Sequence, residues 1–437
     1  FVASSATLED AFLQDAPSGS PEWRTVLALG RGPGGKFLTA LDITDVGEWD
    51  GTNSLSVPTG FQPPELLFTV GNRDGVVDLD PNGESYDGLG ETWSVPVMGR
   101  VHNGGVGQWV LFAGSGYGCV GTDEGRYLYV LKLEDGSVVR KLGPISDVVD
   151  GAAGDLGVDQ NALVATPALF NPHEPGVNDG RDFITRVYIG DLQGLVHKLD
   201  CTDADPANWE LGVFFEVTSE ADLSAGQGNH DQPIAVQAAI LKLATTNRIL
   251  IFLGTGGDSR VEQQEPDRFK MVGMEDADSV SPIAASDPAF AGNLILTDTG
   301  DLFFFDLPEG HRALVAPVTA RNTSTNGVVF FASSSKELVL ASCTVEFSST
   351  LTAVAVTGGL GAFDLDPTLG GVQGTVDLGQ GKTTGLFHRD EHLYVSKSGG
   401  LGVTGETMVL GGDTFPSPPT AAGNLQLLVE TFRLSPF

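Results

Sequence analysis

One pattern of residues recurs along the chain, reading Val187-Tyr-Ile-Gly-Asp-Leu-Gln-Gly-Leu-Val-His-Lys-Leu-Asp200 in one copy and Leu294-Ile-Leu-Thr-Asp-Thr-Gly-Asp-Leu-Phe-Phe-Phe-Asp306 in another. Each copy has an apolar strand, a glycine-containing turn, a second apolar strand and a final aspartate. Two strands joined by a tight glycine turn form a β-hairpin. Looser copies occur at Gly35–Asp42 and Gly125–Glu134. The sequence therefore predicts hairpins that repeat along the chain.

The rest of the chain has the same all-β character. Short runs rich in Val, Leu, Ile and Phe are bounded by turn-forming residues, and the 437 residues include 58 glycines and 24 prolines. Gln237–Leu243 has the one fair helical pattern, although a strand followed by a hairpin turn explains it as well. Repeated hairpins in a long all-β chain are typical of a β-propeller of four-stranded blades. The strand spacing predicts seven irregular blades, with six or eight left open.

The composition shows no domain boundary within residues 21–410. We expect a lead-in segment over residues 1–20 and a single β-propeller over residues 21–437. That domain would include a Pro/Ser-rich loop at 411–423 and a closing C-terminal strand at Leu425–Leu434. No apolar run reaches membrane-spanning length, so the sequence predicts a chain that does not span a membrane. The start at Phe1, without methionine or a leader, is typical of a processed or excised piece.

The chain is strongly acidic, with 24 Lys and Arg against 57 Asp and Glu and a formal net charge of −33. This charge argues against nucleic acid or an anionic membrane surface as a partner, because both are polyanions. Cations remain possible partners, and a solvated acidic surface suited to solubility or to a saline habitat is the alternative. The three cysteines are isolated and have no metal-ligand spacing, so they predict neither a disulfide framework nor a zinc site.

Several motifs together resemble a known family. They follow one another in the family's order, from Trp23-Arg-Thr-Val-Leu-Ala-Leu-Gly through Phe112-Ala-Gly-Ser-Gly-Tyr, Ala165-Thr-Pro-Ala-Leu and Val187-Tyr-Ile-Gly-Asp-Leu-Gln-Gly to Phe252-Leu-Gly-Thr-Gly-Gly-Asp and Val328-Val-Phe-Phe-Ala-Ser. In these motifs the chain resembles the C-terminal β-propeller of type IV pilus tip-associated adhesins and biogenesis factors, the PilY/PilC group.

The resemblance carries expectations about fold and function. It implies a quinoprotein-like propeller displayed outside the cell at the pilus tip, after export through the periplasm and outer membrane. It implies a role in pilus assembly and attachment, with minor pilins or other pilus-tip proteins and a host or abiotic surface as partners. In several members of the family an acidic loop binds calcium, so calcium is the cofactor that the resemblance implies.

One candidate calcium site follows from spacing alone. Asp78-x-Asp80-x-Asn82-Gly reproduces the first half of a calcium loop, with oxygen donors at positions one, three and five and a glycine at six. The twelfth position is a leucine rather than a glutamate, so Glu84, Asp87, backbone carbonyls or water would have to complete the shell. The alternative is a solvated acidic hairpin loop.

A second candidate site is the stretch that corresponds to the family's calcium loop, Asn171–Asp182. Its donors would be Asn178, Asp179 and Asp182. The stretch is longer than the usual loop and contains Arg181, so a polar turn in which Asn and Asp cap backbone groups is the alternative.

The sequence contains none of the complete catalytic motifs that an enzyme of this fold class would need. The isolated cysteines and unevenly spaced tryptophans do not form a quinone-cofactor site, and neither a GxSxG nor an HExxH motif occurs. The scattered histidines are expected in loops. We therefore predict a binding protein rather than an enzyme. The alternatives are a degenerate quinoprotein-like or carbohydrate-active propeller enzyme, and a structural subunit of a surface filament.

Overall fold

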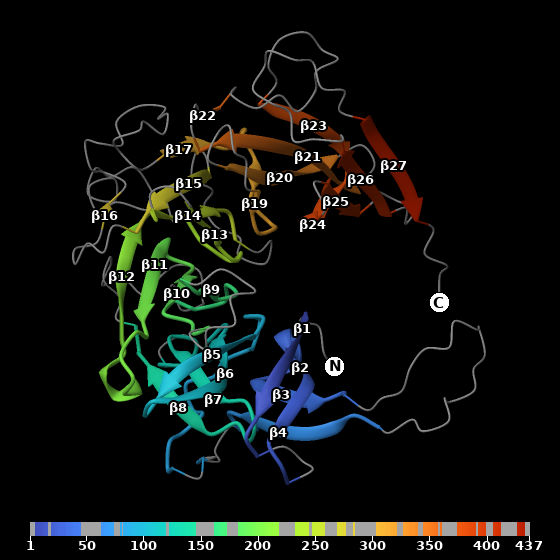
Figure 1. The fold of residues 1–437 in the computed structure, drawn as a ribbon. Coiled ribbons are helices and arrows are strands. Elements are labelled where there is room, and N and C mark those ends of the chain that lie inside the picture. The colour runs from blue at the N-terminus through green and yellow to red at the C-terminus, as the bar shows by residue number, and fades with distance from the viewer. Residues whose placement is uncertain are drawn as a thin grey trace. The chain divides into compact units, whose positions relative to one another are not determined.

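The computed structural model is an all-β protein, as the sequence predicts (Figure 1). It forms two compact units, residues 1–192 with 197–213 and residues 193–196 with 214–437. The residues that the structure describes are 5–15, 19–44, 63–73, 79–80, 82–118, 122–145, 161–172, 182–217, 232–243, 247–257, 269–276, 283–284, 303–320, 327–339, 344–356, 359–360, 374–389, 392–398, 405–411 and 426–432.

The first unit begins with two antiparallel four-stranded sheets, each with its strands in sequence order. The strands of the first sheet are β1 (Ala6–Leu13), β2 (Glu22–Gly30), β3 (Phe37–Asp42) and β4 (Glu65–Gly71). The strands of the second sheet are β5 (Val97–Asn103), β6 (Val106–Gly114), β7 (Leu128–Lys132) and β8 (Val138–Leu142). Two 3-10 turns, η1 (Gly32–Gly34) and η2 (Pro206–Asn208), are the helical elements of the described residues.

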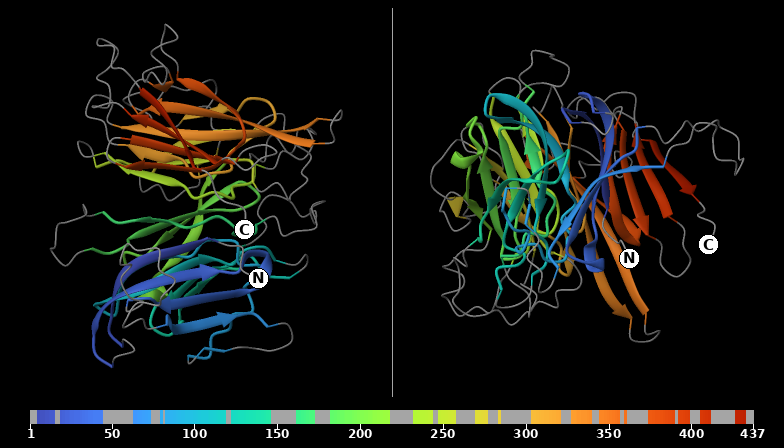
Figure 2. Two further views of the ribbon diagram at one scale, coloured as in Figure 1. Left: turned by 90° about the vertical axis from the view of Figure 1, so that its right-hand side faces the viewer. Right: turned by 90° about the horizontal axis from the view of Figure 1, so that it is seen from below.

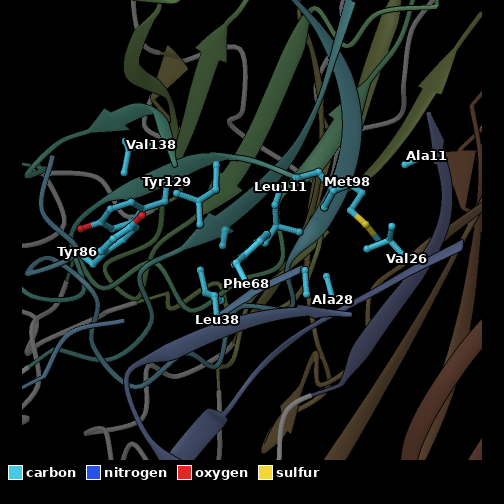
Figure 3. Close-up of a cluster of buried hydrophobic side chains, with 14 of the residues drawn as sticks. Ala11, Val26, Ala28, Leu38, Phe68, Tyr86, Met98, Leu111, Tyr129 and Val138 are labelled. Atoms are coloured by element: carbon cyan, nitrogen blue, oxygen red, sulfur yellow. The ribbon is translucent and has the colours of Figure 1, made fainter. Parts of the chain in front are cut away.

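The second sheet is buried on both faces, which explains why its two central strands contain continuous apolar runs, Trp109–Ala113 in β6 and Leu128–Leu131 in β7. Leu111 and Tyr129 belong to a core shared with the first sheet, whereas their neighbours Phe112 and Val130 belong to a core on the opposite face. Alternate residues of a strand point to opposite faces, so a central strand with a neighbouring sheet on each side buries consecutive residues rather than every second one. Figure 3 shows the first core, with Tyr86 and Tyr129 at one end.

A third sheet contains the hairpin from which the sequence analysis started. It consists of β9 (Ala168–Phe170), β10 (Arg186–Gly190), β11 (Leu195–Asp200), β12 (Glu210–Glu216) and the short β16 (Ile283–Ala284), in the order β16-β12-β11-β10-β9. The predicted hairpin is therefore confirmed as β10 and β11. Its turn includes Gly194, which has a φ of 95°, in the left-handed region that favours glycine.

The remaining strands form three further sheets. One joins β13 (Ala239–Lys242), β14 (Ile249–Gly254), β15 (Lys270–Glu275) and β17 (Phe303–Asp306). The next contains β18 (His311–Arg312), β19 (Val318–Ala320), β20 (Val328–Val339), β21 (Thr344–Ala355), β22 (Gly359–Leu360) and β23 (Thr375–Gln380). The last joins β24 (Lys382–Arg389), β25 (His392–Ser398), β26 (Gly405–Gly411) and β27 (Gln426–Phe432).

The sheet that contains β20 and β21 is also buried on both faces. Val329 and Phe331 pack with residues of β14 and β15, while Val328 and Phe330 pack with Leu393 of β25. Face-to-face stacking of small antiparallel sheets is the way in which propeller blades bury their apolar side chains. The six sheets come from the described residues alone, so the blade number stays a prediction.

Several segment predictions can be compared with these elements. The ambiguous stretch at 237–243 contains strand β13, so its helical pattern did not indicate a helix. The expected lead-in segment contains β1, an edge strand paired along its whole length with β2. The predicted C-terminal strand corresponds to β27, and most of the Pro/Ser-rich loop lies outside the described residues. Within the described part of the chain, no helix is long and apolar enough to cross a bilayer.

Candidate functional site

The first candidate loop lies between β4 and β5 in the first unit. The structure describes Asp80 and the residues from Asn82 onward, whereas Asp78 lies outside the described residues. The Gly83 N–H donates to the Asp80 carbonyl at 3.0 Å, and the Asp80 N–H donates to the Glu84 carbonyl at 2.8 Å. The chain therefore reverses in a tight turn, in which Gly83 has a φ of 87°.

Asp80 is buried at the base of this turn and organises it. Its Oδ1 accepts the backbone N–H groups of Asn82 and Glu84, each at 2.8 Å. Its Oδ2 accepts the N–H of Val138 at 2.9 Å and the side-chain amide of Asn82 at 3.2 Å. An ionised carboxylate has about four lone-pair sites, and these hydrogen bonds use all of them. Asp80 thus fastens the loop to the start of β8.

Asp87 holds the far end of the loop against the same sheet. Its Oδ1 accepts hydrogen bonds from Lys141 Nζ of β8 at 2.5 Å and from Ser85 Oγ at 2.6 Å. The Lys141 ammonium also lies 4.5 Å from the centre of the Tyr127 ring, in a cation–π contact. Partial burial raises the pKa of Asp87, but the hydrogen bonds from Lys141 and Ser85 and the lysine charge outweigh it, so the pKa is lowered overall.

Two tyrosines complete the attachment between these ends. The Tyr86 hydroxyl donates to the Gly136 carbonyl at 2.9 Å, and the Gly88 N–H donates to the Tyr129 hydroxyl at 3.1 Å. The Tyr86 and Tyr129 rings are stacked, with centroids 6.5 Å apart (Figure 3). Burial raises the pKa of Tyr129 well above its ordinary value, so its hydroxyl stays protonated. The loop is thus docked on the β7–β8 hairpin by contacts within the chain.

This arrangement can be compared with what a calcium ion requires. Calcium takes six to eight oxygen ligands. The lone pairs of Asp80 are already used, and Asp87 is paired with a lysine, whereas Asn82 and Glu84 are exposed. Among the described residues, no three or more acidic, histidine or cysteine side chains are placed to hold a metal. The described part of the loop does not fit a calcium centre, and the predicted site there depends on Asp78.

The second candidate loop is described only at its ends. Asn178 and Asp179 lie outside the described residues, and Asp182 is exposed just before β10. The side-chain amide of Asn171 donates a hydrogen bond to Asp182 Oδ1, which closes the base of the stretch. The structure therefore brings Asn171 and Asp182 together, and calcium binding in the stretch between them stays a prediction.

The sequence reasoning missed a buried polar network at the β10–β11 hairpin. His197 Nε2 lies 2.8 Å from Asp191 Oδ2, and the side-chain amide of Asn161 donates to the same oxygen at 3.1 Å. All three residues are buried. One signal was available, because an aspartate occupies the position of Asp191 in the second copy of the hairpin, at Asp298. Closed off from solvent, the network holds the hairpin in place.

The expected loop location of the histidines is wrong for four of them. They lie in strands β5, β18, β24 and β25, as His102, His311, His388 and His392. His311 is buried, with its Nδ1 3.1 Å from Ser333 Oγ, and desolvation lowers its pKa although the charge of Asp377 opposes the shift. In β18 the Ser333 hydroxyl gives the buried imidazole of His311 a hydrogen-bond partner.

Comparison with known proteins identifies the fold. The family model of the PilY1 beta-propeller domain matches residues 9–301. The crystal structure of the Pseudomonas aeruginosa PilY1 C-terminal domain superposes with a TM-score of 0.60 and 18% identity, covering 91% of this chain and 83% of that one. The predicted β-propeller class is therefore confirmed.

Curated relatives match part of the chain. The type IV pilus biogenesis factor PilY1 of Pseudomonas aeruginosa strain UCBPP-PA14 is 25% identical over 319 residues, which are 68% of this chain and 23% of the relative. A PilY1 homolog of Xylella fastidiosa is 23% identical over 298 residues, covering 68% of this chain and 17% of the relative. The chain thus spans less than a quarter of either relative. Because the family model covers well over half of its residues, the chain belongs to the PilY1 beta-propeller domain family.

Proposed function

We propose that this chain is the binding and scaffolding propeller of a type IV pilus biogenesis factor. The match of residues 9–301 to the PilY1 beta-propeller domain carries the proposal, and two curated relatives are named as type IV pilus biogenesis factors. The protein would be exported through the periplasm and outer membrane and displayed at the pilus tip. There it would contact minor pilins or other tip proteins and attach to a host or abiotic surface.

The proposed role is binding rather than catalysis. The curated relatives are named for pilus biogenesis and not for a reaction. The histidine–carboxylate pair of His197 and Asp191 is buried and hydrogen-bonded within the chain, so a substrate has no direct access to it. A protein with a net charge of −33 favours partners that present basic groups.

We also propose that calcium binds this chain and orders one loop. We assign the calcium site to the stretch from Asn171 to Asp182 rather than to the loop that contains Asp80. Asp80 has no lone pair left for a metal, whereas Asp182 is exposed beside the stretch that carries Asn178 and Asp179. Calorimetric titration of the metal-stripped chain with calcium tests this assignment. Asp179→Asn together with Asp182→Asn should abolish the heat, and Asp80→Asn should preserve it.

The pilus role is tested by complementation in the source organism. Deleting the gene should reduce surface pili and attachment, and the full-length protein should restore both. A full-length protein that lacks residues 21–437 but reaches the cell surface should fail to restore them. Normal piliation and attachment with this deletion would refute the proposed role. Loss of calcium binding without loss of pili would refute the calcium proposal alone.

A further inference from the structure

Two polar side chains lie side by side in the first sheet, where β3 begins and β4 ends. Lys36 comes just before β3 and Asn72 just after β4, and Figure 2 shows these two strands side by side, in blue and lighter blue. The Asn72 N–H donates to the Lys36 carbonyl at 2.9 Å, which continues the pairing of Phe37 with Gly71. Directly opposed residues of an antiparallel pair point to the same face of the sheet, so the two side chains are neighbours.

A third side chain, Glu124, reaches this pair from the connection between β6 and β7. Lys36 Nζ donates to Glu124 Oε1 at 2.9 Å and to Oε2 at 3.1 Å. Asn72 Nδ2 donates to the same Oε1 at 2.8 Å. One carboxylate oxygen thus binds both an amine and an amide nitrogen. The side chains of Lys36 and Glu124 are only 19% and 16% exposed, so the chain covers most of this contact.

The side-chain amide of Asn72 is held in one orientation. Its Nδ2 also donates to the carbonyls of Asp87 and Leu89, each at 3.0 Å. All three oxygens around this nitrogen are acceptors, so the hydrogen-bond network assigns the NH₂ group to this position. The nitrogen of the amide, and not its oxygen, therefore faces Glu124.

The backbone that carries Glu124 is fixed as well. The Gly125 N–H donates to the Gly88 carbonyl at 2.9 Å, and the Leu163 N–H donates to the Gly125 carbonyl at 2.8 Å. Gly118 packs so closely that a Cβ added to it would lie 1.8 Å from the Glu124 carbonyl oxygen. The carboxylate is thus positioned beside both nitrogens by contacts within the first unit.

This arrangement contains the groups that an amide-exchange reaction requires. An amine attacks a carbonyl carbon in its neutral form, so a base must first accept its proton. The nitrogen that leaves an amide carbon must in turn receive a proton. A carboxylate in contact with both nitrogens can accept the first proton and donate the second. Groups that are held in contact react far faster than groups that must meet by diffusion.

We propose that Lys36 and Asn72 form an isopeptide bond, with Glu124 as the catalytic residue. Glu124 accepts a proton from the Lys36 ammonium, and the neutral amine attacks Cγ of Asn72, so that a C–N bond forms and the carbonyl electron pair moves to Oδ1. Glu124 then transfers a proton from Nζ to Nδ2. The carbonyl re-forms as the Cγ–Nδ2 bond breaks, and its electron pair leaves with the nitrogen. Ammonia takes up the remaining proton as ammonium, which returns Glu124 to its carboxylate form.

The new bond would join the start of β3 to the end of β4, which is an edge strand of the first sheet. A covalent link of this kind restricts the unfolded chain and stabilises the folded one. It would also keep β4 attached to its sheet when the chain is pulled. The reaction needs these three residues alone, so it does not depend on the pilus role or on calcium.

Mass spectrometry of the purified, folded chain tests the proposal. Loss of ammonia should lower its mass by about 17 Da. Trypsin does not cut after a lysine whose Nζ is part of an amide, so residues 32–73 should be recovered as one peptide with this mass loss. Absence of that peptide after prolonged incubation near neutral pH would overturn the proposal. So would a loss of about 17 Da with normal cleavage after Lys36, because it would indicate a succinimide at an asparagine instead.

Matched variants test the role of each residue. Lys36→Arg, Asn72→Ala and Glu124→Gln should each abolish the mass loss. Lys270→Arg, at a lysine whose ion pair lies in the second unit, should preserve it. Asn72→Asp should still form the bond, with loss of water and about 18 Da, which a purely structural role of this position would not produce. Unchanged hydrogen exchange at Val110–Ala113 verifies folding of each variant. A bond that still forms in Glu124→Gln would refute the catalytic assignment.

Discussion

Removing the carboxylate of Asp80 should release the docked loop without unfolding the chain. Asp80→Ala deletes the acceptor of three backbone N–H groups. The N–H of Val138 belongs to a buried residue and cannot regain a water partner, which costs about 2 kcal/mol. The N–H groups of Asn82 and Glu84 are in exposed residues and lose about 0.5 kcal/mol each. Together the docking free energy should fall by about 3 kcal/mol.

Hydrogen exchange measured by mass spectrometry reports the loss of docking free energy at individual segments of the chain. A loss of about 3 kcal/mol corresponds to about 100-fold faster exchange at residues 82–90 and at Val138. Asp80→Asn keeps an oxygen for Asn82 and Glu84 but presents an NH₂ group toward the Val138 N–H. Its acceleration should therefore be smaller, about tenfold.

Two controls make the result specific to Asp80. Glu84→Gln, in the same loop, should leave exchange at Val138 unchanged because the Glu84 side chain is exposed. Exchange in β14, in the second unit, should not change in any variant. If Asp80→Ala left the exchange of Val138 at the rate of the unmodified chain, the docking role of Asp80 would be refuted. Slowing of exchange in this loop by calcium, lost in Asp80→Asn, would contradict the assignment of all four lone pairs to hydrogen bonds.

Three further outcomes follow from other contacts within the first unit. The pKa of Asp87 is lowered in the folded chain, so its pairing with Lys141 stabilises the docked loop above the unfolded pKa of about 3.9 and is lost as the pH falls through the lower folded value. Loop exchange should accelerate in that acid range, and Lys141→Ala should reduce the pH dependence without removing it, because hydrogen bonds from Ser85 and the Gly88 backbone also lower this pKa. Gly136→Ala should lower the melting temperature and cost about 2 kcal/mol, because φ is 75° there and an added Cβ would lie 2.7 Å from the Phe68 ring. Burial, followed by the charge of Asp200, raises the pKa of the Cys201 thiol to about 12, so iodoacetamide at about pH 8 should alkylate it only after unfolding in urea, as peptide mass spectrometry can determine.

The fold could be predicted from the repeated hairpins because each hairpin is specified by residues that are close together in the sequence. A glycine that supplies a left-handed turn and short runs of consecutive apolar residues are both visible in the sequence, as Gly194 and Val187–Ile189 show. Face-to-face stacking of sheets requires that apolar pattern. The number of blades was harder to predict from the sequence. Short strands such as β9 and β18 have too few residues to show the alternating pattern by which a strand is recognised.

The candidate site was less predictable for a different reason. Spacing placed Asp80 at the third position of a calcium loop, but its partner Val138 lies 58 residues away in sequence. Whether a carboxylate holds an ion or backbone N–H groups depends on which element packs against it. The Asp87–Lys141 pair, 54 residues apart, was hidden in the same way. Such long-range contacts are set by the stacking of the sheets and leave no local pattern.

Piliation of cells that carry the full-length protein without residues 21–437 tests the proposed role most directly. Electron microscopy of these cells, with surface export of the truncated protein verified by immunoblot, should show a loss of surface pili that the intact protein restores. Pili in normal number, together with normal attachment, would contradict the assignment of this propeller to pilus biogenesis.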